Sequence, residues 1–140
     1  MFRRSPLEQY GRAKHDAQAE FASAHEKTLM LFDGAIDFMG VAQQAIVRSD
    51  YELKGKMISK AIAVVNGLKD CLDFRQGELP NNLRDLYEYI VDQLFQANRA
   101  SDREAIENVQ LLLKTIRESW AQIPPNKHQV TSVKSFKNNT

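Results

Sequence analysis

Hydrophobic residues recur at intervals of three and four over four long segments of the chain, which is the pattern of amphipathic α-helices. These segments run from about Ser23 to Arg48, Asp50 to Gln76, Pro80 to Ala100 and Ser101 to Ile123. In none of them do apolar and polar residues alternate as in a half-buried β-strand. The last segment shows the pattern most clearly, with an apolar face made of Ile106, Val109, Leu113, Ile116, Trp120 and Ile123. The pattern therefore predicts four helices.

Start and stop signals separate these helices. Ser23, Ser49 and Ser101 are each followed three residues later by a glutamate, which is the spacing of a capping box. Pro124-Pro125 ends the fourth helix, because proline cannot continue one. The connections are short, so we expect consecutive helices to pack as antiparallel neighbours. The predicted fold is all-α, an antiparallel up-down four-helix bundle over residues 23–125.

The two ends of the chain differ from the bundle in composition. Residues 1–22 carry only a weak apolar pattern and predict a short, mobile N-terminal leader. Its first residues, MFRRSPLEQ, lack the apolar run of a secretory signal. Residues 126–140 contain three lysines and no acid, and they are rich in Asn, Ser and Thr. This composition predicts a disordered basic tail.

Charge and cysteine content narrow the class of protein. The chain has 19 Lys plus Arg and 18 Asp plus Glu, a formal net charge of +1. This balance argues against a dedicated nucleic-acid binder, which carries a clear basic excess. The single cysteine, Cys71, excludes an intrachain disulfide and a cysteine-based zinc cluster, and it favours a reducing, cytoplasmic setting. No run approaches the roughly 18 apolar residues of a membrane-spanning helix, so we expect no membrane insertion.

Residues with catalytic or metal-binding potential are few. A di-iron site in a bundle needs Glu-x-x-His pairs, and no glutamate stands three residues before His15, His25 or His128. His25 adjoins the predicted start of the first helix and is expected to be solvated. The sequence contains neither a Gly-rich phosphate loop nor a G-x-S-x-G elbow. We therefore expect no metal, no cofactor and no enzymatic activity.

Surplus apolar surface is the informative feature. Leu29, Met30 and Val41 fall outside the apolar stripe of the first helix, and the face of the second helix covers about half of its circumference. In the fourth helix, Leu111 lies nearly opposite the apolar face and Leu112 lies at its edge. Such surplus predicts hydrophobic grooves that bind amphipathic partner helices. The residues we expect in these grooves are Ile58, Ile62, Val65, Leu111 and Leu112.

One run of the first helix resembles a known family. The run Leu29–Met39, LMLFDGAIDFM, is similar to the leucine–Tyr/Phe–Asp-Gly-Ala-Ile-x-Phe signature of FliS-type flagellin export chaperones. The resemblance extends over about residues 5–123 and includes Tyr10. The chain departs from the family at Ala24, where the family usually has a proline in the first turn of the helix. We interpret Gly34, in the signature's Asp33-Gly34 pair, as a point of close helix approach.

The resemblance implies a cytosolic, ATP-independent bacterial chaperone. Such a chaperone binds the disordered C-terminal region of flagellin, prevents premature polymerisation and assists delivery to the flagellar type III export gate. It also implies an N-terminal lid that covers the groove when the client is absent, and Leu7, Tyr10 and Phe21 fit this lid. Exposed grooves could pair two copies into a homodimer without client.

A second hypothesis rests on the fold alone. A non-catalytic helical-bundle adaptor or a phosphotransfer-like signalling module would have the same four helices. A phosphotransfer module would require an exposed, reactive histidine in mid-helix. Neither an adaptor nor a phosphotransfer module explains the run Leu29–Met39.

Overall fold

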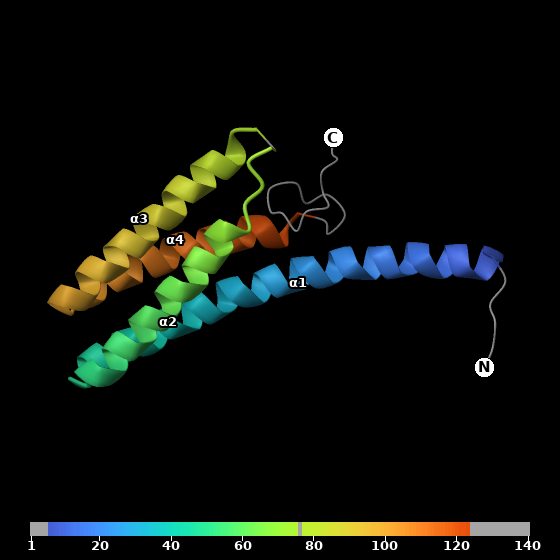
Figure 1. The fold of residues 1–140 in the computed structure, drawn as a ribbon. Helices are drawn as coiled ribbons and strands as arrows, with labels where there is room; N and C mark the ends of the chain where they lie inside the picture. Colours follow the sequence, from blue (N-terminus) through green and yellow to red (C-terminus); the bar gives the residue numbers. More distant parts are fainter. Residues whose placement is uncertain (1–5, 76, 124–140) are drawn as a thin grey trace.

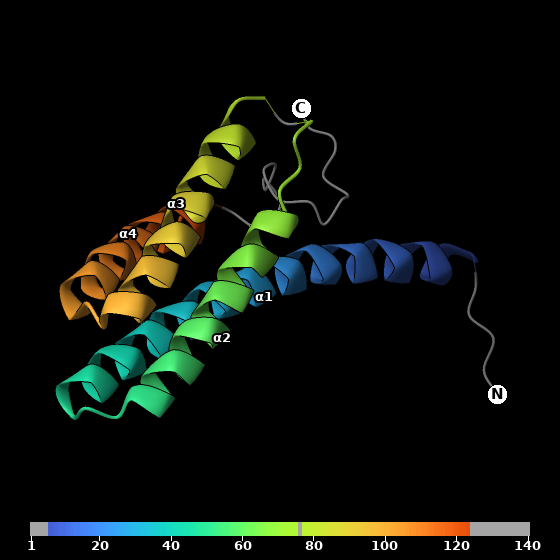
Figure 2. The same cartoon turned by 60° about the vertical axis from the view of Figure 1, so that its left-hand side comes forward.

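Residues 6–75 and 77–123 fold into four α-helices, as the sequence predicts. The computed structural model describes residues 6–75 and 77–123, with side chains from Ser23 onward. The helices are α1 (Pro6–Val47), α2 (Tyr51–Asp70), α3 (Leu79–Ala100) and α4 (Arg103–Ala121). Figures 1 and 2 show α2 beside α1, and α3 beside α4. Helix α1 also packs against α4, and α2 against α3. The antiparallel all-α bundle is therefore confirmed.

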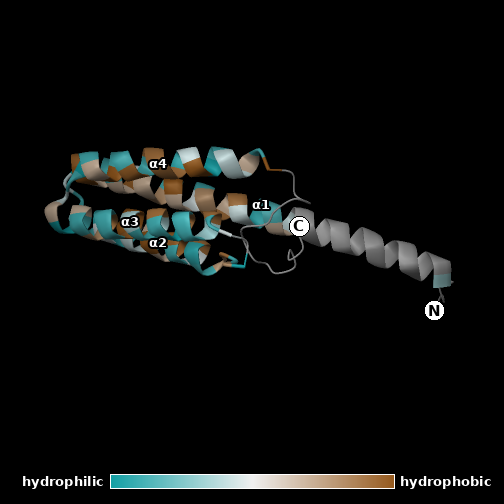
Figure 3. Cartoon of the chain, turned by 90° about the horizontal axis from the view of Figure 1, so that it is seen from above, coloured by the Kyte–Doolittle hydropathy of each residue, from teal (hydrophilic) through white to brown (hydrophobic). Residues whose placement is uncertain are grey.

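A continuous hydrophobic core runs between the four helices. Brown and teal alternate along each described helix in Figure 3, because apolar residues face inward and polar residues outward. Every helix contributes large side chains that are almost fully buried, among them Phe32, Met39, Ile58, Val65, Ile90, Leu94, Ile106 and Leu113. The α3 phenol of Tyr87 is also buried, and this burial, with a smaller contribution from the charge of Cys71, raises the pKa of Tyr87.

Helix α1 begins much earlier than predicted. It starts at Pro6, so the expectation of a helix start at Ser23 is wrong. Proline suits the first position of a helix, and residues 12–20 are mostly Ala, Arg, Lys, Gln and Glu, which favour the helix. A serine with capping-box spacing does not interrupt such a run. The proposed lid side chains Leu7, Tyr10 and Phe21, and the basic tail 126–140, lie outside the described residues.

The α1–α2 turn is a Ser-Asp pair. Ser49 adopts a left-handed conformation with φ of 59°, and the Asp50 N–H donates to the carbonyl oxygen of Ala45 at 2.8 Å, as in a Schellman motif. The Asp50 carboxylate then accepts from the Leu53 N–H at 3.2 Å and caps α2. The predicted capping residue, Ser49, is therefore wrong by one position. Serine closes the preceding helix, and aspartate opens the next.

The α3–α4 turn repeats this arrangement. Ser101 has φ of 50°, and the Asp102 N–H donates to the carbonyl oxygen of Ala97 at 3.0 Å. Asp102 caps α4 by accepting from the Ala105 N–H at 3.1 Å. The prediction that Ser101 caps the fourth helix is thus wrong for the same reason.

A buried lysine ties the start of α2 to the α3–α4 turn. The Lys54 ammonium donates to the carbonyl oxygen of Asn98 at 2.8 Å and to the hydroxyl oxygen of Ser101 at 3.0 Å. It also lies 5.6 Å from the ring centroid of Tyr51, within range of a cation–π interaction. Because these contacts join two turns, Lys54 holds the two helical hairpins together at this end of the bundle.

Helix α2 ends at Asp70, earlier than the predicted end at Gln76. The Asp73 carboxylate accepts from the Arg75 backbone N–H at 3.1 Å and from its Nε at 2.8 Å. The same contact raises the pKa of the Arg75 guanidinium. An aspartate that binds its own backbone two residues later stabilises a turn in competition with the helix, which explains the early end.

Candidate partner-binding groove

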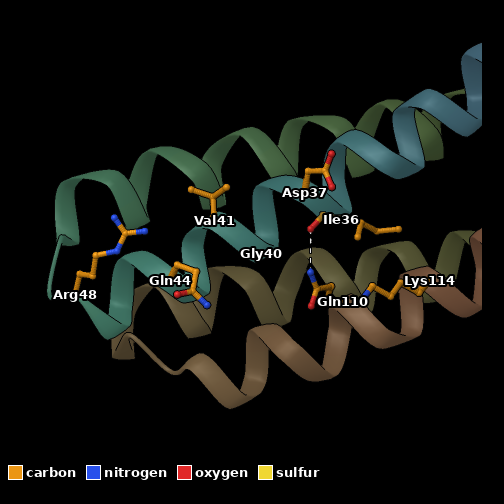
Figure 4. Close-up of a pocket in the computed structure, with 8 residues that line it drawn as sticks. All are labelled: Ile36, Asp37, Gly40, Val41, Gln44, Arg48, Gln110 and Lys114. Carbon is orange, nitrogen blue, oxygen red and sulfur yellow. Dashed lines mark hydrogen bonds between the residues drawn. The ribbon is translucent and has the colours of Figure 1, made fainter.

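A groove lies along the seam between α1 and α4. Its volume is about 560 Å³. Figure 4 shows the side chains of both helices around it. Within it, Val41 is 41% exposed although it is aliphatic. The residues that line the groove are Ile36, Asp37, Gly40, Val41, Gln44 and Arg48 of α1, and Gln110 and Lys114 of α4.

The groove has a hydrogen-bonded floor. The Gln110 amide nitrogen donates to the carbonyl oxygen of Ile36 at 3.0 Å, the dashed line in Figure 4. The Gln43 amide nitrogen donates in turn to the Gln110 side-chain oxygen at 2.9 Å. A Cβ at Gly40 would lie 3.4 Å from the Gln110 amide nitrogen, so glycine leaves room for Gln110 against α1. These contacts hold the groove open at a fixed width without burying apolar side chains in it.

An ion pair joins the same two helices about one turn before Ile36 in α1. The Arg117 Nε donates to one carboxylate oxygen of Asp33 at 3.0 Å, and its Nη2 to the other at 3.4 Å. The hydrogen bond to Asp33 raises the pKa of the Arg117 guanidinium. An exposed pair contributes little stability, but this two-point contact favours one register of α1 on α4. The aspartate of the Asp33-Gly34 pair is therefore a link between helices.

Gly34 has no close neighbour. Apart from its two chain neighbours and the local helix backbone, no heavy atom of the described residues lies within 4 Å of the position that a Cβ would occupy. The interpretation of Gly34 as a point of close helix approach is therefore wrong. Within the described chain, nothing requires glycine at this position.

His25 is buried, contrary to expectation. Its ring stacks on Trp120 of α4 with centroids 5.4 Å apart and an angle of 18° between the planes. The His25 Nε2 lies 3.3 Å from the Trp120 carbonyl oxygen, and the Trp120 indole N–H donates to the His25 carbonyl oxygen at 3.5 Å. A stacked and enclosed imidazole is poorly placed to receive a phosphoryl group. This geometry weighs against a phosphotransfer role for His25.

The structure separates the five predicted groove residues. Ile58 and Val65 are fully buried and Ile62 is 8% exposed, so these three α2 residues belong to the core cluster. Leu112 is partly buried and packs against the same cluster. Leu111 alone is largely exposed, at 54%, and it does not line the α1–α4 groove. Binding through the α2 residues would require the bundle to open, and their role in binding stays a prediction.

The sequence pattern did not reveal the α1–α4 groove, because a wide apolar face has two explanations. A helix between two neighbours buries about half of its circumference, so the breadth of α2 reflects packing. Val41 carried the better signal, since it lies outside the core stripe of its own helix. Whether a groove adjoins Val41 depends on how α4 packs against α1, which the sequence of α1 alone does not show.

Within 6–75 and 77–123, no group of three or more His, Cys, Asp or Glu residues is placed to hold a metal ion. No helix in the same ranges is both long and apolar enough to cross a membrane.

Comparison with known proteins identifies the family. Residues 6–127 match the model of the family described as flagellar protein FliS. The chain is 39% identical over 127 residues to the flagellar secretion chaperone FliS of Salmonella typhimurium, covering 89% of this chain and 94% of that protein. It is 32% identical over 130 residues to FliS of Vibrio cholerae (92% and 96%), and 33% identical over 121 residues to FliSB of Pseudomonas aeruginosa (86% and 96%). The chain therefore belongs to the FliS family of flagellar secretion chaperones, with a role in protein export for flagellar assembly.

Proposed function

We propose that this chaperone binds the C-terminal segment of flagellin in the bacterial cytosol. In this proposal it prevents premature polymerisation and assists delivery to the flagellar type III export gate. The observation that carries the proposal is the family match over residues 6–127. The relatives are named secretion chaperones, and a secretion chaperone requires a client.

The α1–α4 groove suits an amphipathic client helix. Val41 and Ile36 offer an apolar surface, whereas Asp37, Arg48 and Lys114 supply charges at its edges. An apolar centre with a polar rim is the usual composition of a helix-binding groove. A disordered client that folds on binding buries about 1,000–3,000 Å² and loses about 2–5 kcal/mol to ordering. A client of this kind therefore covers more surface than this groove, and exposed Leu111 is a second anchor in the proposal.

The remaining parts of the proposal concern the free chaperone. Because α1 is one helix from Pro6 to Val47, the lid proposal requires the first part of α1 to unwind, so that Leu7, Tyr10 and Phe21 cover the client-binding surface. In the absence of both client and lid, two copies pair. The α2 residues Ile58, Ile62 and Val65 contact the client when the bundle opens around them. The client is released by the unfolding pull of the export gate.

Calorimetry tests client binding. The full chain is titrated at two temperatures with a peptide containing the last forty or so residues of flagellin from the same organism. We expect one-to-one binding with a negative heat-capacity change, because apolar surface is buried. If folded protein gives no heat at either temperature, the flagellin assignment is wrong.

A pair of variants tests the groove. Val41→Asp introduces a charge where the client's apolar face would lie, and we expect Kd to rise about tenfold or more. Tyr89→Asp is the matched control, since Tyr89 is 53% exposed on α3, which packs against α2 and α4. Circular dichroism confirms that both variants are folded. Equal Kd values for Val41→Asp and the unaltered chain would move the client away from this groove without affecting the flagellin assignment.

A further inference from the structure

A second, smaller pocket lies at the end of the bundle away from the two Ser-Asp turns. It has a volume of about 100 Å³ and an almost entirely apolar lining. Helices α1, α3 and α4 all contribute to it, through Phe32, Leu83, Ile116 and Trp120 among others. Leu79, at the start of α3, is exposed at its rim. This pocket exposes apolar surface to water, so burial of another apolar side chain in it would be favourable.

The chain leaves the bundle at this pocket. Ile123 lines it and is the last residue that the structure describes. Pro124-Pro125 follows, so the chain cannot continue along the axis of α4. Residues 126–140 then contain three apolar residues at intervals of three, Val130, Val133 and Phe136. The basic tail thus starts beside an apolar pocket and carries one aromatic side chain.

We propose that Phe136 of the basic tail docks in this pocket of its own chain. A cavity of about 150 Å³ accommodates benzene, so a pocket of this size suits a single ring with slight adjustment. The thirteen residues from Pro124 to Phe136 are long enough to return to the pocket, because an extended residue spans about 3 Å. Such a short tether gives an effective concentration in the millimolar range, so a weak contact suffices for docking.

The positive charge of the tail also favours its docking in this pocket. The tail carries Lys127, Lys134 and Lys137 and no acid. Near the pocket, Glu78 immediately precedes the rim residue Leu79, and Glu26 lies on α1 two residues before the lining residue Thr28. Both glutamates are exposed, so docking would bring lysines toward carboxylates. This inference does not depend on the identity of the client.

Paramagnetic NMR on the full chain tests the contact. A nitroxide label is placed at Lys137→Cys in a Cys71→Ser background, and methyl broadening is measured at Leu83 and Ile116 of the pocket. Ile106, at the start of α4, is the distant reference. Tethering alone broadens the nearby methyls, so the comparison is with Phe136→Ser carrying the same label. Loss of the ring should lower the docking equilibrium constant about 30-fold, and the broadening at both pocket methyls should fall accordingly.

Two further variants and one mixed sample complete the test. Phe136→Leu should retain most of the broadening, and the polar exchange Thr131→Ser should retain all of it. Unchanged broadening with Phe136→Ser would overturn the proposal. So would equal broadening in a mixture of labelled and isotope-enriched molecules, which would identify a second copy as the occupant. A shift of the pocket methyls caused by Tyr10→Ser, and not by Phe136→Ser, would assign the pocket to the N-terminal lid and overturn it as well.

Discussion

Replacing Gly34 by alanine should stabilise this chaperone. Glycine in a helix interior is about 0.8–1.0 kcal/mol less favourable than alanine. A Cβ at Gly34 would meet no heavy atom of another described helix within 4 Å, so no steric cost from these helices offsets the gain. We therefore expect Gly34→Ala to raise the free energy of unfolding by about 1 kcal/mol. For a domain of this size that corresponds to a rise in Tm of about 3–5 °C.

Two other glycines calibrate the measurement. Gly67 in α2 also has nothing within 4 Å, so Gly67→Ala should give a similar gain. At Gly40 a Cβ would lie 3.4 Å from the Gln110 amide, so Gly40→Ala should give a smaller gain or a loss. Urea unfolding followed by circular dichroism measures all three. If Gly34→Ala is destabilising while Gly67→Ala is stabilising, a contact with residues outside 6–75 and 77–123 restricts Gly34, and the reasoning is refuted.

The same variant also reports on partner binding. Within residues 6–75 and 77–123 of the free chain nothing requires glycine at position 34, so a partner that approaches this point would give the small residue a use. If Gly34→Ala stabilises the protein and raises Kd for the flagellin peptide, the client contacts α1 at this point. If it stabilises the protein and leaves Kd unchanged, the client binds elsewhere on the bundle.

Three more outcomes follow from the turns and the core. Ser49→Gly should raise the free energy of unfolding in urea by about 0.5–1 kcal/mol, because glycine adopts the left-handed conformation without strain. Ser101→Gly should give almost no gain, because it also removes the hydroxyl that accepts a hydrogen bond from Lys54. Lys54→Met should lower the free energy of unfolding by about 1–3 kcal/mol, because two charge-assisted hydrogen bonds are lost. A Tm equal to or higher than that of the unaltered chain would contradict this expectation. Because burial raises the pKa of Tyr87, the unfolded chain releases this proton near pH 10 while the folded chain retains it. The free energy of unfolding is therefore unaffected by this group below pH 10 and falls as the pH rises further. In urea unfolding at a series of alkaline pH values, Tyr87→Phe should show a smaller fall.

The sequence was sufficient for the helices and for the family. Apolar spacing of three and four residues predicts helices without reference to neighbours, because the period belongs to the helix itself. The run Leu29–Met39 pointed to the FliS family, and the comparisons confirm it. The predicted helix ends were less accurate than the predicted helices. Ser49 and Ser101 looked like caps by spacing, but the adjacent aspartates compete for the same backbone N–H groups and occupy the capping position.

The candidate site depended on information that one helix does not contain. The wheel of α2 marks Ile58 and Val65 as apolar, and it cannot tell whether a core or a partner covers them. His25 looked solvated because the tryptophan that covers it is 95 residues away in sequence. The α1–α4 groove likewise requires Gln110 to lie against the carbonyl oxygen of Ile36.

By itself, the sequence determined that this protein is helical, that its helices pack in sequence order and that it belongs to a chaperone family. These properties follow from local periodicity, short connections and a contiguous motif. The tertiary structure decided which apolar residues are core and which are surface, where the groove lies, and why Asp33 is paired while Gly34 is open. Such properties depend on contacts between residues distant in sequence, and only the packing of one helix on another creates them.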